Sequence, residues 1–314
     1  MGASLAVVFV LLALNLATVK MFGEMEFWFA MIKIVAIVSL IVIGVVMVAV
    51  GFTSPSGVTA SFAHLWNDGG WFPKGIGGFF AGFQIAVFAF VGIELVGTTA
   101  AETHDPEKSL PRAINSIPVR IIMFYVFALI MIMSVTPWRS VAPDKSPFVA
   151  LFMLVGLPAA ASIINFVVLT SAASSANSGV FSTSRMLYGL AQDGVAPKRF
   201  AQLSRRAVPA SGLLFSCICL LAGVVLIYLI PNVMTVFTMV TTVSAILFMF
   251  VWTIILCSWL VYRKKRPDLH EKSIYKMPLG SVMCWVCMAF FVFVLCLLTL
   301  QTDTRQALMV TPLW

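Results

Sequence analysis

The 314-residue chain is 61% hydrophobic and only 10% charged, whereas a soluble domain is typically about 45–50% apolar and about 25% charged. This composition excludes a soluble globular protein. The net charge of +8 could attract nucleic acid, but the basic residues are spread over several loops, so we expect a membrane protein that binds no nucleic acid.

Apolar windows recur along the whole chain, separated by short polar segments that contain proline or glycine. A helix of about 20 apolar residues is long enough to cross a bilayer. The windows lie at about 2–19, 27–52, 77–100, 118–136, 148–190, 210–230, 233–262 and 280–300, with a stub from about 306. We therefore predict an all-α polytopic membrane protein with about eight crossings and a truncated ninth, in one transmembrane domain.

The third window contains a glycine and a carboxylate at a depth where a simple membrane helix would be surrounded by lipid tails. Gly92 has no Cβ and weakens the helix, and Glu94 follows two residues later. A carboxylate at the bilayer centre costs about 3 kcal/mol, so Glu94 should face protein or water. If the helix opens between about Phe88 and Gly92, the released backbone must line a cavity. Close helix packing through Gly92 and Gly97 is the alternative.

The fifth window is too long for one crossing, and its second half is polar. That half contains Asn177, Ser178, Ser182 and Ser184, and the seventh window contains Thr241, Thr242 and Ser244. These side chains could line a path through the membrane. Serine and threonine also serve as ordinary contacts between membrane helices, so the assignment stays open.

The basic residues predict the orientation in the membrane. Alternate loops and adjoining helix ends divide the 20 lysines and arginines into sixteen and four. The larger set is Lys20, Lys33, Lys108, Arg112, Arg120, Arg185, Lys198, Arg199, Arg205, Arg206, Arg263, Lys264, Lys265, Arg266, Lys272 and Lys276; the smaller is Lys74, Arg139, Lys145 and Arg305. Because cytoplasmic loops carry the excess of positive charge, the larger set is predicted to be cytoplasmic.

Signals for an enzyme or a metal protein are weak. All six cysteines lie in apolar runs, which favours buried small hydrophobic side chains over redox or metal chemistry. The three histidines are scattered over different loops, and neither a phosphate-binding loop nor a G-x-S-x-G motif is present. We expect no enzyme activity, no metal and no cofactor.

Three separated segments carry a specific resemblance. They are "NLATVKMFGEMEFWFAMIKIVAIV" from Asn15, "FAFVGIELVGTTAAETHDPEKSLPRAI" from Phe88 and "ANSGVFSTSRMLYGLAQDGVAPKRFAQLSRRAVP" from Ala176. The chain resembles the bacterial amino acid transporter branch of the amino acid–polyamine–organocation superfamily over essentially its whole length. The segments match the passage between the fourth and fifth helices, the sixth helix with its following loop, and the end of the eighth helix.

The resemblance implies the LeuT-like fold of two inverted five-helix repeats. Residues 1–52 would end the first repeat, residues 77–262 would form the second, and residues 280–314 would begin the accessory C-terminal helices. The crossings would correspond to helices four through eleven of the family. Both ends of the sequence fall within apolar runs, so we expect a fragment that lacks the first three helices and the C-terminal end.

The resemblance also implies the function and part of the site. We expect a permease of the bacterial inner membrane that carries small neutral amino acids, such as D-serine, D-alanine and glycine, together with protons. Its substrate-binding residues would be Phe88, Ala89, Phe90, Val91, Gly92 and Glu94, with Phe90 as a gate. The break in the family's first helix, which holds the substrate carboxylate, has no counterpart in this sequence.

Lys33 is the candidate for proton coupling, because some proton-coupled members of the superfamily place a lysine near this position. A lysine held away from water can cycle between its charged and neutral forms. The alternative is a lysine that extends to the cytoplasmic interface. A channel or receptor-like subunit and a non-functional fragment remain as alternative interpretations of the whole chain.

Overall fold

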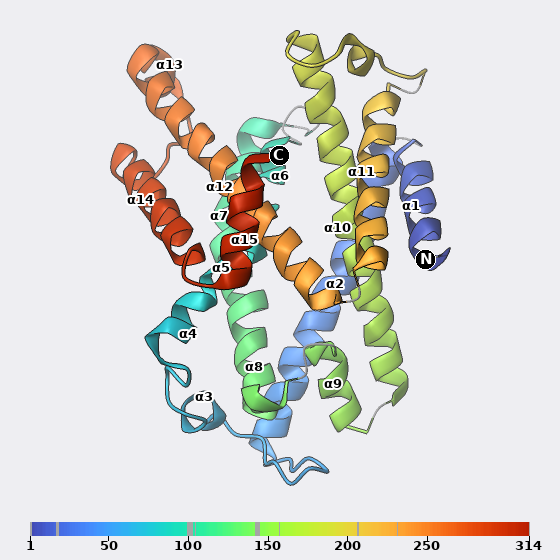
Figure 1. Ribbon diagram of the computed structural model, residues 1–314, viewed down its shortest axis with the longest axis vertical. Helices are drawn as coiled ribbons and strands as arrows, with labels where there is room; N and C mark the ends of the chain where they lie inside the picture. The colour runs from blue at the N-terminus through green and yellow to red at the C-terminus, as the bar shows by residue number, and fades with distance from the viewer. Residues whose placement is uncertain are drawn as a thin grey trace. The chain divides into compact units, whose positions relative to one another are not determined.

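The computed structural model describes residues 2–16, 19–98, 103, 105–141, 145–156, 158–205, 207–230 and 232–313 (Figure 1). Arg206, one of the basic residues predicted to be cytoplasmic, lies outside the described residues. Within these ranges the regular elements are helices, and an isolated bridge joins Thr53 to Thr59. The predicted all-α class is therefore confirmed.

The chain divides into two compact units, residues 1–71 with 115–229 and residues 72–114 with 230–314. The first contains α1 (Gly2–Asn15), α2 (Val19–Ala49), α3 (His64–Asn67), η2 (Ile122–Phe127), α8 (Ala128–Val135), η3 (Trp138–Ser140), α9 (Pro147–Leu154), α10 (Pro158–Gln192), η4 (Lys198–Ala201) and α11 (Ala210–Leu229). The second contains α4 (Gly75–Ala81), α5 (Phe83–Ala89), α6 (Leu95–Thr98), α12 (Val233–Lys265), α13 (Pro267–Lys272), α14 (Ser281–Leu298), α15 (Thr302–Val310) and η5 (Thr311–Leu313). α7 (Pro106–Ile121) continues from the second unit into the first.

Five described helical stretches are long and apolar enough to cross a membrane: 23–49, 106–135, 159–192, 234–265 and 281–298. Shorter apolar helices occupy 5–15, 75–89 and 210–226. Together they overlap the eight predicted windows, and the chain is a multi-pass membrane protein. The number of complete crossings stays a prediction, because three of the windows contain helices shorter than a full span.

Two of the predicted windows contain interrupted helices. The window at 148–190 divides into α9 and α10, because Gly156 has a φ of +74° beyond the end of α9 and Pro158 begins α10. A glycine in the left-handed region ends a helix readily, and proline suits the first position of the next one. The window at 77–100 divides into α4, α5 and α6.

The core of the first unit lies where α2, α8, α9 and α10 meet. Leu40, Met131, Leu151 and Ile164 are buried there. A second apolar cluster joins α1, α10 and α11 (Figure 1) around Val8, Val180, Leu213 and Cys217. These two clusters position α10 against both α1 and α2.

The core of the second unit surrounds α12. Val87 of α5, Met249 of α12 and Val294 of α14 pack together, and α15 also lies against α12. The contact between α5 and α12 brings the interruption after α5 close to side chains that lie far away in the sequence.

Candidate functional site

The interruption after α5 begins at Phe90 and ends before Leu95. The backbone amides of Phe90, Val91 and Ile93 donate to the carbonyls three residues earlier, at Val87, Phe88 and Phe90. Leu95 likewise donates to Gly92. The chain therefore follows tight turns here instead of the four-residue spacing of an α-helix.

Gly92 lies in the middle of these turns, with a φ of +105°. This conformation is open to glycine and costly for residues that carry a Cβ. The predicted helix opening at Phe88–Gly92 is present, displaced by about two residues toward the C-terminus. Among the described residues, no backbone amide donates to the carbonyls of Val91 and Ile93.

The Glu94 carboxylate is held by two donors. The Gly92 amide lies 3.0 Å from Oε1 and 3.2 Å from Oε2, and the Trp252 indole Nε1 donates to Oε2 at 3.2 Å. Hydrogen bonds to an ionised acceptor are stronger than neutral ones. Glu94 therefore stabilises the turn at Gly92 and connects it to α12.

A second polar contact joins α5 to α12. The buried amide of Gln84 donates to the Thr241 hydroxyl at 3.1 Å, and Thr241 in turn donates to the carbonyl of Phe237 at 2.8 Å. The Trp252 ring packs against Phe291 with their centroids 5.9 Å apart. The interrupted segment is thus anchored to α12 at two levels.

Lys33 belongs to a separate polar cluster, in the first unit. Its Nζ donates to the Ser174 hydroxyl of α10 at 2.8 Å, and Ser174 donates to Glu26 Oε2 at 2.7 Å. The Asn177 amide donates to Glu26 Oε1 at 2.9 Å, and the Asn15 amide donates to Asn177 Oδ1. The cluster therefore joins α1, α2 and α10 through side chains of both charges.

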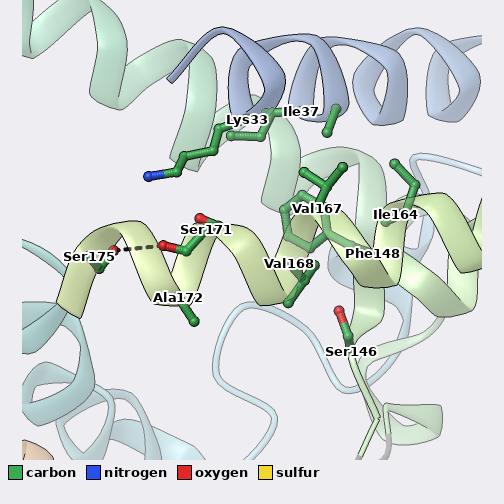
Figure 2. Close-up of a pocket in the computed structure, with 11 residues that line it drawn as sticks. Lys33, Ile37, Ser146, Phe148, Ile164, Val167, Val168, Ser171, Ala172 and Ser175 are labelled. Carbon is green, nitrogen blue, oxygen red and sulfur yellow. Dashed lines mark hydrogen bonds between the residues drawn. The ribbon is translucent and has the colours of Figure 1, made fainter. Parts of the chain in front are cut away.

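Lys33 also lies at the edge of a cavity of about 340 Å³ between α2, α9 and α10. Figure 2 shows Lys33 extending from α2 toward α10, where Ser171 and Ser175 lie. Most of the remaining lining is apolar, with Ile37, Ile164 and Val167 among it. The Lys33 ammonium is turned toward α10, where it donates to Ser174.

The structure places the predicted residues in two groups. Phe88 and Ala89 end α5, Phe90, Val91, Gly92 and Glu94 lie in the interruption that follows, and Lys33 lies in the other compact unit. Ser184, predicted as a possible path-lining residue, is buried and donates to the carbonyl of Phe181 in its own helix.

Sequence reasoning missed Trp252, Glu26 and Ser174. Glu26 and Lys33 are seven residues apart, which places them on the same face of a helix, and Ser174 and Asn177 are three apart. That spacing could have suggested two facing polar stripes. Nothing in the sequence indicated that Trp252 would contact Glu94, because the contact depends on how α12 packs against α5.

Comparison with known proteins identifies the family. A family profile described as amino acid permease matches residues 1–311. This chain belongs to the amino acid permease family. The predicted superfamily is confirmed by this match.

Several curated members of the amino acid permease family are similar to the chain over nearly its whole length. A D-serine/D-alanine/glycine transporter of Escherichia coli strain K12 is 84% identical over 312 residues, covering 99% of this chain and 66% of that protein. The amino-acid permease AapA of Bacillus subtilis is 53% identical, covering 97% of this chain and 65% of that protein. A probable threonine/serine transporter, YbxG, of the same organism is 43% identical, covering 95% and 64%. The chain thus spans just under two thirds of the length of these relatives.

Proposed function

We propose that this chain is a secondary active carrier that brings small neutral amino acids across the bacterial inner membrane together with protons. The observation that carries the proposal is the interruption at residues 90–94 within an apolar segment, held open by Gly92 and Glu94. The family match and the 84% identity to a D-serine/D-alanine/glycine transporter support D-serine, D-alanine and glycine as the substrates.

The interruption offers a binding surface for the ammonium of an amino acid. The carbonyls of Val91 and Ile93, which accept no backbone hydrogen bond within the described residues, suit a cationic group. Phe88 and Phe90 would form the wall, with Phe90 as the gate. Glu94 would act on the backbone shape instead of the substrate, since its carboxylate already accepts from Gly92 and Trp252.

The fold proposed for the carrier is the LeuT-like inverted repeat, with residues 1–52 ending one repeat, residues 77–262 forming the next and residues 280–314 accessory. In that arrangement, an interrupted helix opens alternately to the two sides of the membrane. Backbone that leaves its helix in a membrane must line a cavity or contact protein. In a carrier, the interruption after α5 would line the substrate cavity.

Lys33 is proposed to couple transport to protons. The prediction is that Lys33→Ala abolishes accumulation driven by a proton gradient and preserves substrate exchange at equal pH. The charge-preserving variant Lys33→Arg tests whether charge alone is sufficient, because an arginine stays protonated and cannot cycle. Wild-type accumulation by Lys33→Ala would exclude the coupling role.

The test of the function is uptake by the protein reconstituted in liposomes. Labelled D-serine, D-alanine and glycine should enter with saturable kinetics, and an external excess of one substrate should drive counterflow of another. A protonophore should abolish accumulation and leave counterflow intact. Single-channel currents without counterflow would instead show a channel, and the absence of both would refute a transport role.

A further inference from the structure

We propose that Glu26 and Ser174 extend Lys33 into a proton path, in which the Ser174 hydroxyl passes a proton between Lys33 and the Glu26 carboxylate. The proposal rests on the proton symport proposed above and adds two residues that the family match does not identify. It assigns Glu26 as the second proton-carrying group and Ser174 as the relay.

The hydrogen bonds of the cluster run in one direction. Lys33 Nζ donates to Ser174 Oγ at 2.8 Å, and Ser174 Oγ donates to Glu26 Oε2 at 2.7 Å. Both distances are short enough for proton transfer along a preformed chain. The other carboxylate oxygen, Oε1, accepts from the Asn177 amide at 2.9 Å. Asn177 therefore fixes the carboxylate with Oε2 directed at Ser174.

Burial isolates the relay from bulk water. Ser174 and Asn177 are each 1% exposed, and Asn15, which bonds Asn177, is 7% exposed. A relay hydroxyl away from water keeps its two partners, whereas an exposed one would exchange them with solvent. Lys33 and Glu26 are each partly exposed, and the buried Ser174 hydroxyl connects them.

The surrounding elements supply few competing charges. Several helices pack against α2. Of these, α1, α8 and α9 contain no ionisable residue, and η2 contains only Tyr125. α10 contains Arg185 and Tyr188, two or more turns beyond Asn177. α2 itself carries Lys20 and Glu24 in addition to the pair. Glu26 is the carboxylate that the described hydrogen bonds connect to Lys33.

The transfer is balanced without another reactant. A Lys33 N–H bond breaks as its proton moves to Ser174 Oγ, and the original Ser174 proton moves to Glu26 Oε2. The products are a neutral amine and a neutral carboxylic acid, and the reverse step restores the charged ammonium and carboxylate. Because Lys33 Nζ and Glu26 Oε2 both bond Ser174 Oγ, each transfer moves charge no farther than two hydrogen bonds of 2.8 and 2.7 Å can span.

The matched test compares Ser174→Ala with Ser175→Ala in liposomes. Ser175 is the neighbouring residue on α10, is exposed, and donates only to the carbonyl of Ser171 in the described structure. Proton influx is followed with a pH-sensitive dye inside the liposomes as glycine is added outside. Ser174→Ala should reduce influx at least roughly tenfold, with counterflow within about twofold of wild type, and Ser175→Ala should match wild type.

Glu26→Gln provides the second test, since it keeps the size of the side chain and cannot be protonated. It should lose glycine-driven proton influx, keep counterflow, and flatten the dependence of glycine uptake on external pH. Counterflow also reports that each variant is folded. If Glu26→Gln loses counterflow as well, while Ser174→Ala retains normal influx, the cluster is structural and the relay is excluded.

The two proposals fail differently. Wild-type protein that shows counterflow but no glycine-driven proton influx would overturn proton symport itself. If wild-type protein shows normal glycine-driven proton influx and both Ser174→Ala and Glu26→Gln keep it, only the relay is overturned. Lys33 would then be a coupling group that acts alone.

Discussion

Gly92 shows how a single residue position fixes the candidate substrate site. Its φ of +105° is costly for alanine, although a Cβ would meet only Leu95 Cδ1, at 4.0 Å. We expect Gly92→Ala to lower the free energy of unfolding by about 1–3 kcal/mol through backbone strain. The measurement is denaturant unfolding in mixed micelles, monitored by tryptophan fluorescence.

Gly97→Ala is the control for this substitution. Gly97 also has open space around it, with nothing within 4 Å of an added Cβ and no positive φ. Its substitution should leave stability unchanged or raise it, because alanine favours helix. Equal effects of the two substitutions would show that the turn at Gly92 does not need a glycine.

The hydrogen bond between Trp252 and Glu94 is expected to contribute to the free energy of unfolding. Trp252→Phe removes the indole donor at 3.2 Å and keeps an aromatic ring beside Phe291. A double-mutant cycle with Glu94→Ala should give a coupling of at least about 0.5 kcal/mol in the free energy of unfolding. Trp285, exposed on α14, provides the control: Trp285→Phe and Glu94→Ala should be additive.

At the scale of residues, the sequence predicts an unusual position more readily than the partner of that position. Gly92 and Glu94 are conspicuous in a sequence because each is unfavourable in a plain membrane helix. Trp252, Ser174 and Glu26 do not stand out in the sequence in this way. Trp252 contacts Glu94, which is 158 positions away, and Ser174 contacts Lys33, which is 141 positions away. Residue type alone therefore indicated the unusual positions and not their partners.

At the scale of elements, α10 and α11 pack closely through a glycine. A Cβ built at Gly212 would lie 2.9 Å from the Ser184 carbonyl oxygen. Because that atom belongs to the backbone of a packed helix, it cannot move as a side chain would. We expect Gly212→Ala to reduce the free energy of unfolding by about 1–3 kcal/mol.

Gly223→Ala in the same helix is the matched control, since nothing lies within 4 Å of its Cβ. It should be neutral or slightly stabilising in the same unfolding assay. A loss of stability as large as that of Gly212→Ala would mean that the close approach to the Ser184 carbonyl does not determine the effect.

The predicted apolar windows located the helices well and their interruptions less well. Windows such as 233–262 and 280–300 correspond closely to α12 and α14, because a long apolar run has few alternatives to a membrane helix. The window at 148–190 concealed the break between α9 and α10, since apolar residues continue on both sides of Gly156 and hydropathy does not report backbone conformation.

At the scale of the whole molecule, the distribution of basic residues predicts which loops face the cytoplasm. Gln202 lies in the loop with Lys198, Arg199 and Arg205, and Ser56 lies in a loop predicted to be outside. Each position is replaced by cysteine, as Gln202→Cys or Ser56→Cys, in a protein from which the native cysteines have been removed. A membrane-impermeant maleimide added to intact cells should label Ser56→Cys only, and permeabilisation should expose Gln202→Cys. The reverse labelling would invert the predicted orientation.

The sequence by itself determined the membrane setting, the all-α class, the family and the place where a helix would be interrupted. These properties follow from composition and local pattern: apolar length decides that a segment is a helix, and Gly92 with Glu94 marks the weak point. Only the tertiary structure decided that Trp252 holds Glu94, and that Ser174 connects Lys33 to Glu26. The physical reason is that a hydrogen bond between helices depends on which faces pack together, and that packing is set by the shapes of many side chains at once.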